Sequence, residues 1–227
     1  MILAAQSENT TLADRVFETL CAAIVEGGIP PGSKISEPEL AGRLRVSRAS
    51  LREAIGRLEG CNLVTRRPNV GARVVVLDSN QLLEIYHVRE ALEGMAARLA
   101  AQHMTDAEIK LLKALVNDHV QQVELEADAG QSHFQHVGDL DFHLLIVQGS
   151  HNSRLINLFY NHLYQLLRMY RHQFGLNSQR TRPALAEHHY IVDVIAAHDA
   201  EMAELMMRRH VRASRENLER MLGSPPS

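Results

Sequence analysis

Residues 39–59 have the sequence Glu39-Leu-Ala-Gly-Arg-Leu-Arg-Val-Ser-Arg-Ala-Ser-Leu-Arg-Glu-Ala-Ile-Gly-Arg-Leu-Glu59, which predicts a helix-turn-helix. A short helix is expected to end near Leu44, and Ser47 then supplies the side-chain oxygen that caps a second helix. Apolar residues recur at helical spacing along one side of this second helix: Leu51, Ala54, Ile55 and Leu58. Arginines and hydroxyls at the exposed start of a helix suit entry into a DNA major groove. We therefore expect the chain to bind DNA.

The flanking sequence completes a winged helix-turn-helix. An amphipathic helix from Leu12 to Val25 is expected to stop at Gly27-Gly28, and Ser36-Glu-Pro-Glu39 has the pattern of a capping box that opens the next helix. Asn62 is a candidate for the left-handed residue that ends the recognition helix. The apolar stretches on either side of residues 66–71 predict a β-hairpin, which forms the wing.

From Asp78 onward the periodicity is helical, and no strand signal follows Leu77. Capping residues are expected at Ser79, at Thr105 with Glu108, and at Asp199. The predicted fold is mainly α, an N-terminal winged helix-turn-helix followed by an all-α bundle of about six helices. The predicted helices span about 79–102, 105–127, 132–148, 152–174, 182–197 and 199–221. The expected divisions are a disordered tail at 1–10, a DNA-binding domain at 11–77, a helical domain at 78–222 and a frayed tail at 223–227.

Composition limits the class of protein. The chain has 227 residues and a net charge of −3, and no apolar run approaches the roughly 18 residues needed to span a bilayer. The N-terminus also lacks the basic segment of a signal peptide, so we expect a cytoplasmic protein. The two cysteines, Cys21 and Cys61, form no CxxC pair and are expected to be buried apolar residues. All 13 histidines lie from His87 onward, which makes imidazole the obvious chemical group of the second domain.

Arg48 and Arg52 are separated by four residues and would share the outward face of the recognition helix, where they are expected to reach guanine edges or phosphates. The alternative is a solvated surface pair. A single module makes few contacts, so we expect a two-fold dimer on a pseudo-palindromic operator. Further candidate contacts lie beside these arginines and in the wing: Ser47, Ser50, Arg43, Arg45, Arg66, Arg67, Asn69 and Gly71.

A candidate metal site combines residues of three predicted helices. Asp139 and His143 are separated by four residues, so a helix places them side by side. A chain reversal near His198 would bring His188 and His210 to the same height on two antiparallel helices. Four N and O ligands suit Zn²⁺, Ni²⁺ or Mn²⁺. By helical phase alone His189 fits as well as His188, and the alternative is that these are ordinary polar residues that happen to align.

The whole pattern resembles the FadR-like branch of the GntR family of transcription regulators over roughly residues 11–221. The first half of the resemblance rests on Ile29-Pro-Pro-Gly-Ser-Lys-Ile-Ser-Glu37 and Val46-Ser-Arg-Ala-Ser-Leu-Arg-Glu-Ala54. The second half rests on Val88-Arg-Glu-Ala-Leu-Glu93, Asp139-Leu-Asp-Phe-His143, Glu187-His188 with Ile191, and Arg208-Arg-His210. The chain departs from the pattern at Asn62, where the family usually has glycine, and at Pro38 and Gly42, where some relatives have DNA-contacting arginines.

The resemblance implies an effector-binding helical domain of the type called FCD, which often holds a divalent metal and a small carboxylate. It selects His188 over His189 as the ligand, and it suggests that Arg89 binds the carboxylate of the effector. For Arg89 the alternative is a surface ion pair with Glu93. Tyr164 and Arg168, again four residues apart, are candidates for the lining of the effector pocket.

The sequence therefore predicts a homodimeric transcription regulator, more specifically a repressor, whose operator affinity is controlled by a small carboxylate bound at a divalent-metal site. A rival hypothesis is a metal-dependent enzyme with an appended DNA-binding module. Against it, the nearest candidate bases, Asp141 and Glu187, are each turned about 100° from the neighbouring ligand on the helix. A third hypothesis is a metal that serves only the stability of the bundle.

Overall fold

The computed structural model describes residues 11–67, 70–76, 78–128, 138–174 and 180–223. The chain forms two compact units. The first unit contains the residues up to Val76 together with Gln165–Gln173, and the second contains Leu77–Tyr164 and the residues from Phe174 onward.

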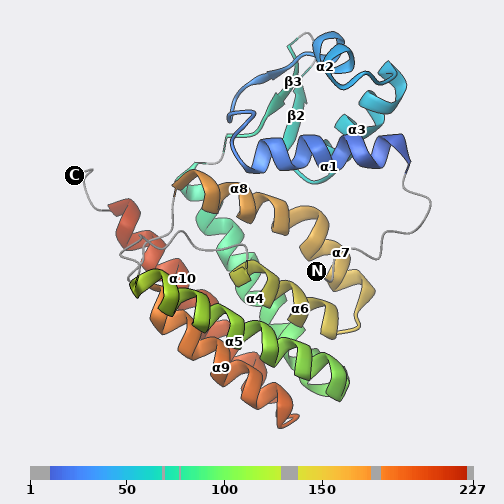
Figure 1. Ribbon diagram of the computed structural model, residues 1–227. Coiled ribbons are helices and arrows are strands. Elements are labelled where there is room, and N and C mark those ends of the chain that lie inside the picture. The colour runs from blue at the N-terminus through green and yellow to red at the C-terminus, as the bar shows by residue number, and fades with distance from the viewer. Residues whose placement is uncertain (1–10, 68–69, 77, 129–137, 175–179, 224–227) are drawn as a thin grey trace. The chain divides into compact units, whose positions relative to one another are not determined.

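The first unit is a winged helix-turn-helix (Figure 1). Its elements are α1 (Leu12–Val25), β1 (Lys34–Ile35), α2 (Glu37–Leu44), α3 (Arg48–Gly60), β2 (Val64–Arg67) and β3 (Gly71–Val74). The unit also contains α8 (Gln165–Phe174) up to Gln173. Helix α1 packs on α3, and the core between them is apolar because Leu20 and Ile24 of α1 and Leu51 and Ile55 of α3 are all buried. The predicted helix-turn-helix and its apolar face are confirmed.

Local chemistry explains where these helices begin and end. Ser47 caps α3 by accepting a 3.1 Å hydrogen bond from the Ser50 amide. Asn62 has a φ of 58°, the left-handed conformation that the sequence predicts after the recognition helix. The expected capping box at Ser36 is wrong in its hydrogen bonding: Ser36 is the N-cap residue of α2 but makes no side-chain cap bond. Pro38 explains part of this result, since it removes one of the amides that a cap can accept from.

The wing is an antiparallel sheet with the strand order β1-β3-β2. Val64 pairs with Val74 and Arg67 with Gly71, which is the predicted hairpin. The short edge strand β1 was not predicted, because its pairing of Ile35 with Ala72 involves only two residues. Two residues give no periodicity from which a strand can be recognised.

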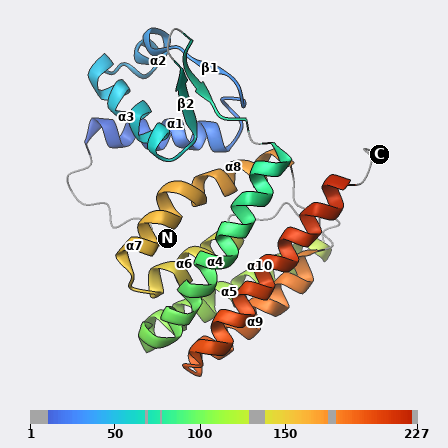
Figure 2. The ribbon, with the colours of Figure 1, turned by 180° about the vertical axis from the view of Figure 1, so that it is seen from behind.

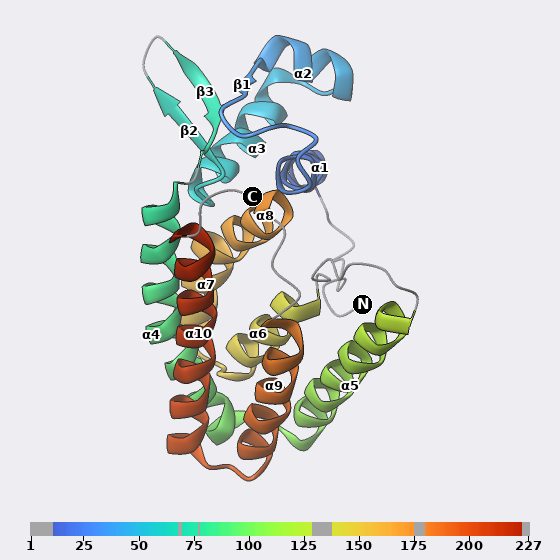
Figure 3. The ribbon, with the colours of Figure 1, turned by 90° about the vertical axis from the view of Figure 1, so that its left-hand side faces the viewer.

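The second unit is a helical bundle (Figures 1, 2 and 3). Its elements are α4 (Ser79–His103), α5 (Asp106–Asp128), α6 (Gly138–Gly149), α7 (Ser153–Phe159), the π-helical turn η1 (Tyr160–Tyr164), α9 (Thr181–Ala196) and α10 (Ala200–Gly223). Helices α4 and α10 pack along one another, and α9 lies against both α10 and α5 (Figure 3). The predicted all-helical architecture is confirmed. Among the described residues, none of the helices combines the length and the apolar character that a membrane span requires.

Two details of the bundle differ from expectation. Asp78, one residue earlier than Ser79, caps α4 by accepting a hydrogen bond from the Gln81 amide. The helix expected at 152–174 contains the π-helical turn, and the boundary between the two compact units falls directly after Tyr164. The capping box of Thr105 with Glu108 and the cap at Asp199 are present as predicted.

Candidate metal centre and DNA-binding surface

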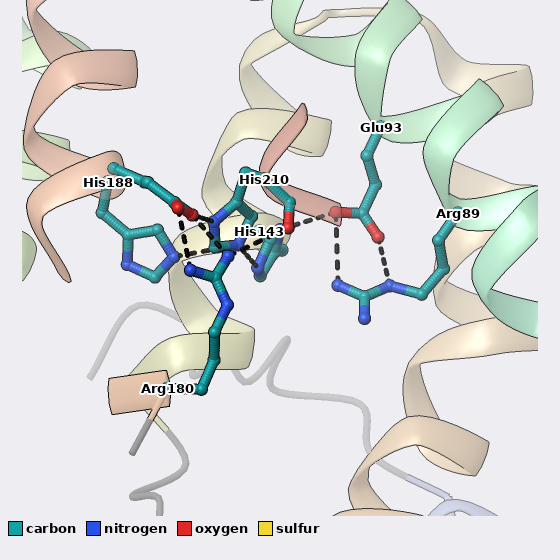
Figure 4. Close-up of polar contacts among 7 residues, drawn as sticks. Arg89, Glu93, His143, Arg180, His188 and His210 are labelled. Carbon is teal, nitrogen blue, oxygen red and sulfur yellow. Dashed lines mark hydrogen bonds and ion pairs between the residues drawn. The ribbon is translucent and has the colours of Figure 1, made fainter. Parts of the chain in front are cut away.

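Three buried histidines from three helices meet inside the bundle (Figure 4). His143 of α6, His188 of α9 and His210 of α10 are at most 3% exposed, and one ring nitrogen of each lies within 4.8 Å of the others. The Nε2 atom of His210 is 3.3 Å from the Nε2 of His188 and 3.3 Å from the Nε2 of His143. Three nitrogens of the same kind therefore face a common point.

The chain reversal between α9 and α10 brings two of these rings together. Helix α9 ends at Ala196 and α10 begins at Ala200, while His198 in the turn has a φ of 56°. His188 lies ten residues before His198 and His210 twelve after, so antiparallel helices bring them to similar heights. Phe142 of α6 stacks on the His188 ring with 3.8 Å between centroids, which fixes the orientation of that imidazole.

Two carboxylates lie behind the histidines, on the side away from the common point. Glu93 of α4 places Oε2 2.5 Å from the Nδ1 of His143, and Glu187 of α9 places Oε2 2.7 Å from the Nδ1 of His210. The contact of Glu187 with His210 is a hydrogen bond, whereas Glu93 and His143 are in contact as an ion pair. A carboxylate that accepts a hydrogen bond from Nδ1–H leaves the lone pair on Nε2, which prepares the imidazole to bind a metal.

Sequence reasoning missed both carboxylates. For Glu93 the sequence suggests only an ion pair with Arg89. Glu187 is turned away from its neighbour His188, but it faces His210 on the adjacent helix. Spacing within one helix gives no signal for a contact between helices, so only the packing of α4, α6, α9 and α10 identifies these two residues.

Both carboxylates are held in the ionised form. Burial raises the pKa of Glu93, but Arg89 and His143 lower it further, so that the pKa is about 2. Burial likewise raises the pKa of Glu187, and hydrogen bonds from His210 and Arg180 outweigh this effect, again giving a pKa of about 2. Arg180 donates to both oxygens of Glu187, at 2.8 Å and 2.5 Å. An ionised carboxylate behind a histidine fixes the orientation of its ring toward a bound metal.

The donor set fits a divalent metal. Zn–N bonds of about 2.0–2.1 Å in tetrahedral geometry would separate two ligand nitrogens by about 3.3 Å, close to the spacing of the Nε2 atoms. With Nδ1–H of His210 directed to Glu187, the Nε2 atom of His210 turns its lone pair toward the common point, an arrangement that a cation there would stabilise. His189 is exposed, so of the two neighbouring histidines only His188 contributes. Asp139 lies on α6 one turn before His143, but its side chain falls outside the described part of the chain.

The three residues expected to bind the effector each make different contacts. Arg89 is 2% exposed, donates from Nε to Glu93 at 2.5 Å, and lies over the ring of Tyr86. Arg89 thus forms the expected ion pair with Glu93, but the pair is buried and does not lie at the surface. Tyr164, also buried, donates from its hydroxyl to Asp141 at 3.1 Å. Arg168 belongs to the first compact unit, where it contacts Gln165.

The start of helix α3 presents the candidate major-groove residues. Arg48 is exposed, and the Arg52 side chain is 64% exposed. The Nε of Arg52 donates to Glu37 of α2 at 2.8 Å, a contact that no spacing within α3 could indicate. The hydroxyls of Ser47 and Ser50 lie 2.9 Å apart at the same end of the helix.

The remaining candidate DNA contacts are on the same unit. Arg43 and Arg45 are exposed, and Arg45 has a φ of 53° where α2 ends. In the wing, Arg66 lies 3.5 Å from Glu59 and Arg67 is exposed. Gly71 has a φ of 88°, a conformation that favours glycine, while Asn69 falls outside the described residues.

A winged helix-turn-helix joined to a helical domain with a buried histidine cluster defines the class of DNA-binding transcription regulators. Family models match both parts: "Bacterial regulatory proteins, gntR family" over residues 12–74 and "FCD domain" over residues 84–213. The chain belongs to the GntR family, in the branch whose C-terminal domain is FCD, as its sequence predicted.

Individual relatives agree with this assignment. The chain is 30% identical over 210 residues to a probable D-xylose utilization operon transcriptional repressor of Paenarthrobacter nicotinovorans, covering 90% of this chain and 88% of that one. It is 37% identical to the Nta operon transcriptional regulator of Aminobacter aminovorans, but over 56% of this chain and 58% of that one. The solved structure of E. coli McbR/YncC has the same fold, with a TM-score of 0.71 and 21% identity over 95% of this chain and 100% of that one.

Proposed function

We propose that this regulator is a repressor whose operator affinity is controlled by a small carboxylate bound at a divalent-metal centre. The observation that supports the metal centre best is the convergence of three buried Nε2 atoms, two of which are opposed by an ionised carboxylate on Nδ1. His143, His188 and His210 would hold the ion together with Asp139. Bound Zn²⁺, Ni²⁺ or Mn²⁺ would offer open coordination positions to the effector carboxylate.

The names of relatives support a repressor. The Paenarthrobacter relative is described as a transcriptional repressor, and so is RspR of E. coli, which is 31% identical over 59% of this chain and 57% of its own length. We further propose a homodimer, because a pseudo-palindromic operator requires two winged domains related by two-fold symmetry.

Arg89 and Tyr164 would line the effector site beside the metal. An effector carboxylate that reaches Arg89 would share its guanidinium with Glu93, which is feasible because arginine has five N–H donors. Effector binding would change the packing of the bundle and, through it, the spacing of the two recognition helices in the dimer. Effector and operator affinities would then be linked reciprocally, typically by about 1–3 kcal/mol.

Thermal unfolding tests this function. Metal-loaded and chelator-treated protein are each melted against a panel of small carboxylates. A ligand at 100 times its Kd adds about 2.7 kcal/mol and raises the Tm by a few degrees in a chain of this size. We expect one carboxylate of the panel to stabilise the metal-loaded protein but not the chelator-treated protein, and to alter the operator affinity. Bound metal with no response to any acid would make the histidine cluster structural and contradict the proposal.

A further inference from the structure

A groove between α9 and α10 opens to solvent and has a volume of about 400 Å³. Ile191 of α9 and Met206 and Ala213 of α10 contribute apolar surface to it, as does Tyr190, a residue that is 52% exposed. The volume falls within the range of about 300–1,000 Å³ that is usual for small-molecule sites. An aromatic ring offers a large apolar surface and a methionine side chain adapts its shape to a ligand, so the groove suits a small apolar body.

The charge in the groove comes from Arg209. Three other arginines of α10 each pair with a carboxylate: Arg208 with Glu204, Arg212 with Glu90 and Arg215 with Glu219. Arg209 is exposed, and no described residue forms an ion pair with it. Its planar guanidinium therefore remains available for a bidentate contact with a carboxylate.

Glu187 also lines the groove, but its charge is already neutralised. Arg180 contacts both of its oxygens, and His210 contacts Oε2. The uncompensated charge in the groove is thus the positive charge of Arg209, which selects an anion. Glu187 and His210 are the two residues that the groove shares with the histidine cluster and its carboxylates, whereas His143 and His188 do not line it.

We propose that this groove binds a small monocarboxylate with an apolar body, at a site separate from the metal centre. The carboxylate contacts Arg209, and the apolar body lies against Tyr190 and Met206. Arg209, Tyr190 and Met206 are not among the proposed metal ligands, so binding does not require a metal ion.

Benzoate serves as the probe and the Met206 methyl group as the reporter. The full-length protein is labelled with ¹³C at its methionine methyl groups, and a Met206→Leu variant assigns the resonance. We expect benzoate to shift the Met206 resonance saturably, equally in metal-loaded and chelator-treated protein. Arg209→Gln should weaken this binding about tenfold through loss of a charge-assisted contact. The matched variant Arg182→Gln, which alters an exposed arginine of α9 outside the groove, should bind like the wild type.

Benzyl alcohol, which keeps the ring but lacks the charge, should shift Met206 at least tenfold less effectively than benzoate. Three results would overturn the proposal. If Arg209→Gln bound benzoate as tightly as the wild type, Arg209 would not be the residue that contacts the carboxylate. Loss of the shift on chelation would place benzoate at the metal centre. A Met206 shift that depends on protein concentration alone would assign the groove to a second copy of the chain.

Discussion

The Oε2 atom of Glu93 lies 2.5 Å from the Nδ1 atom of His143, and both side chains are 1% exposed. The same carboxylate accepts a hydrogen bond from Arg89. Glu93 therefore lies between a buried guanidinium and the imidazole of His143, which we propose as a metal ligand. Removing the charge of Glu93 should therefore weaken metal binding without removing a ligand. Glu93→Gln is expected to lower Zn²⁺ affinity about 10–100-fold, the usual effect of losing an outer-shell partner, as measured by competition with a chromophoric chelator.

This variant needs two controls, because it leaves Arg89 buried without a carboxylate and should also lower the free energy of unfolding. The Zn²⁺ affinities are compared at a temperature at which circular dichroism shows the wild type and both variants to be folded. Glu90→Gln is the matched substitution, since Glu90 lies on the same helix but pairs with Arg212. Zn²⁺ affinities that are equal in all three proteins would show that Glu93 does not act on a metal ligand.

His188 and His189 offer a paired test of the metal centre. The first is fully buried within the cluster, and the second is exposed. His188→Gln should lose tightly bound metal, whereas His189→Gln should retain it, because helical phase separates adjacent side chains by about 100°. The measurement is the metal content per chain after gel filtration in the presence of a weak chelator. Equal metal content in the two variants would place the metal elsewhere.

The two cysteines should be chemically inert in the folded protein. Burial raises the pKa of Cys21 to about 12 and raises that of Cys61 as well. A thiol reacts through its thiolate, so at pH 7.5 an aromatic disulfide reagent should titrate neither cysteine until denaturant is added, and then both. Rapid release of chromophore from the native protein would contradict the burial of these residues in the first unit.

The parts of the fold that could be predicted are those determined by local sequence. Ser47 as a cap, Asn62 in the left-handed region and the apolar stripe of Leu51 and Ile55 each follow from a short segment of chain. Asp78 was missed as the cap of α4 because Ser79 beside it has similar capping chemistry. The strand Lys34–Ile35 is too short to give a period.

Site residues could be predicted only where their relative positions follow from the number of residues along a helix. The turn near His198 sufficed to bring His188 and His210 together, since two antiparallel helices have a known rise. Glu93 could not be found in this way, because its contact with His143 depends on how α4 packs on α6. The pairing of Arg52 with Glu37 was missed for the same reason.

That ion pair leads to a prediction on DNA binding. A base contact that uses the Nε of Arg52 requires the release of Glu37. An exposed ion pair contributes about 0–1 kcal/mol, whereas a bidentate base contact discriminates by about 1–3 kcal/mol, so the exchange is favourable. Arg52→Ala should weaken binding to a selected operator duplex by about 10–100-fold and leave binding to unrelated DNA nearly unchanged. The measurement is fluorescence anisotropy at one fixed salt concentration.

Glu37→Gln tests the same contact from the other side. The substitution frees Arg52 and removes a negative charge near the phosphates, so operator affinity should rise a few-fold. In the Arg52→Ala background, Glu37→Gln should raise operator affinity by a smaller factor, because part of the rise depends on the freed arginine. Arg15→Ala, on the exposed face of α1, controls for the general loss of positive charge. If Arg15→Ala weakens operator binding as much as Arg52→Ala does, Arg52 acts through overall charge and does not contact a base.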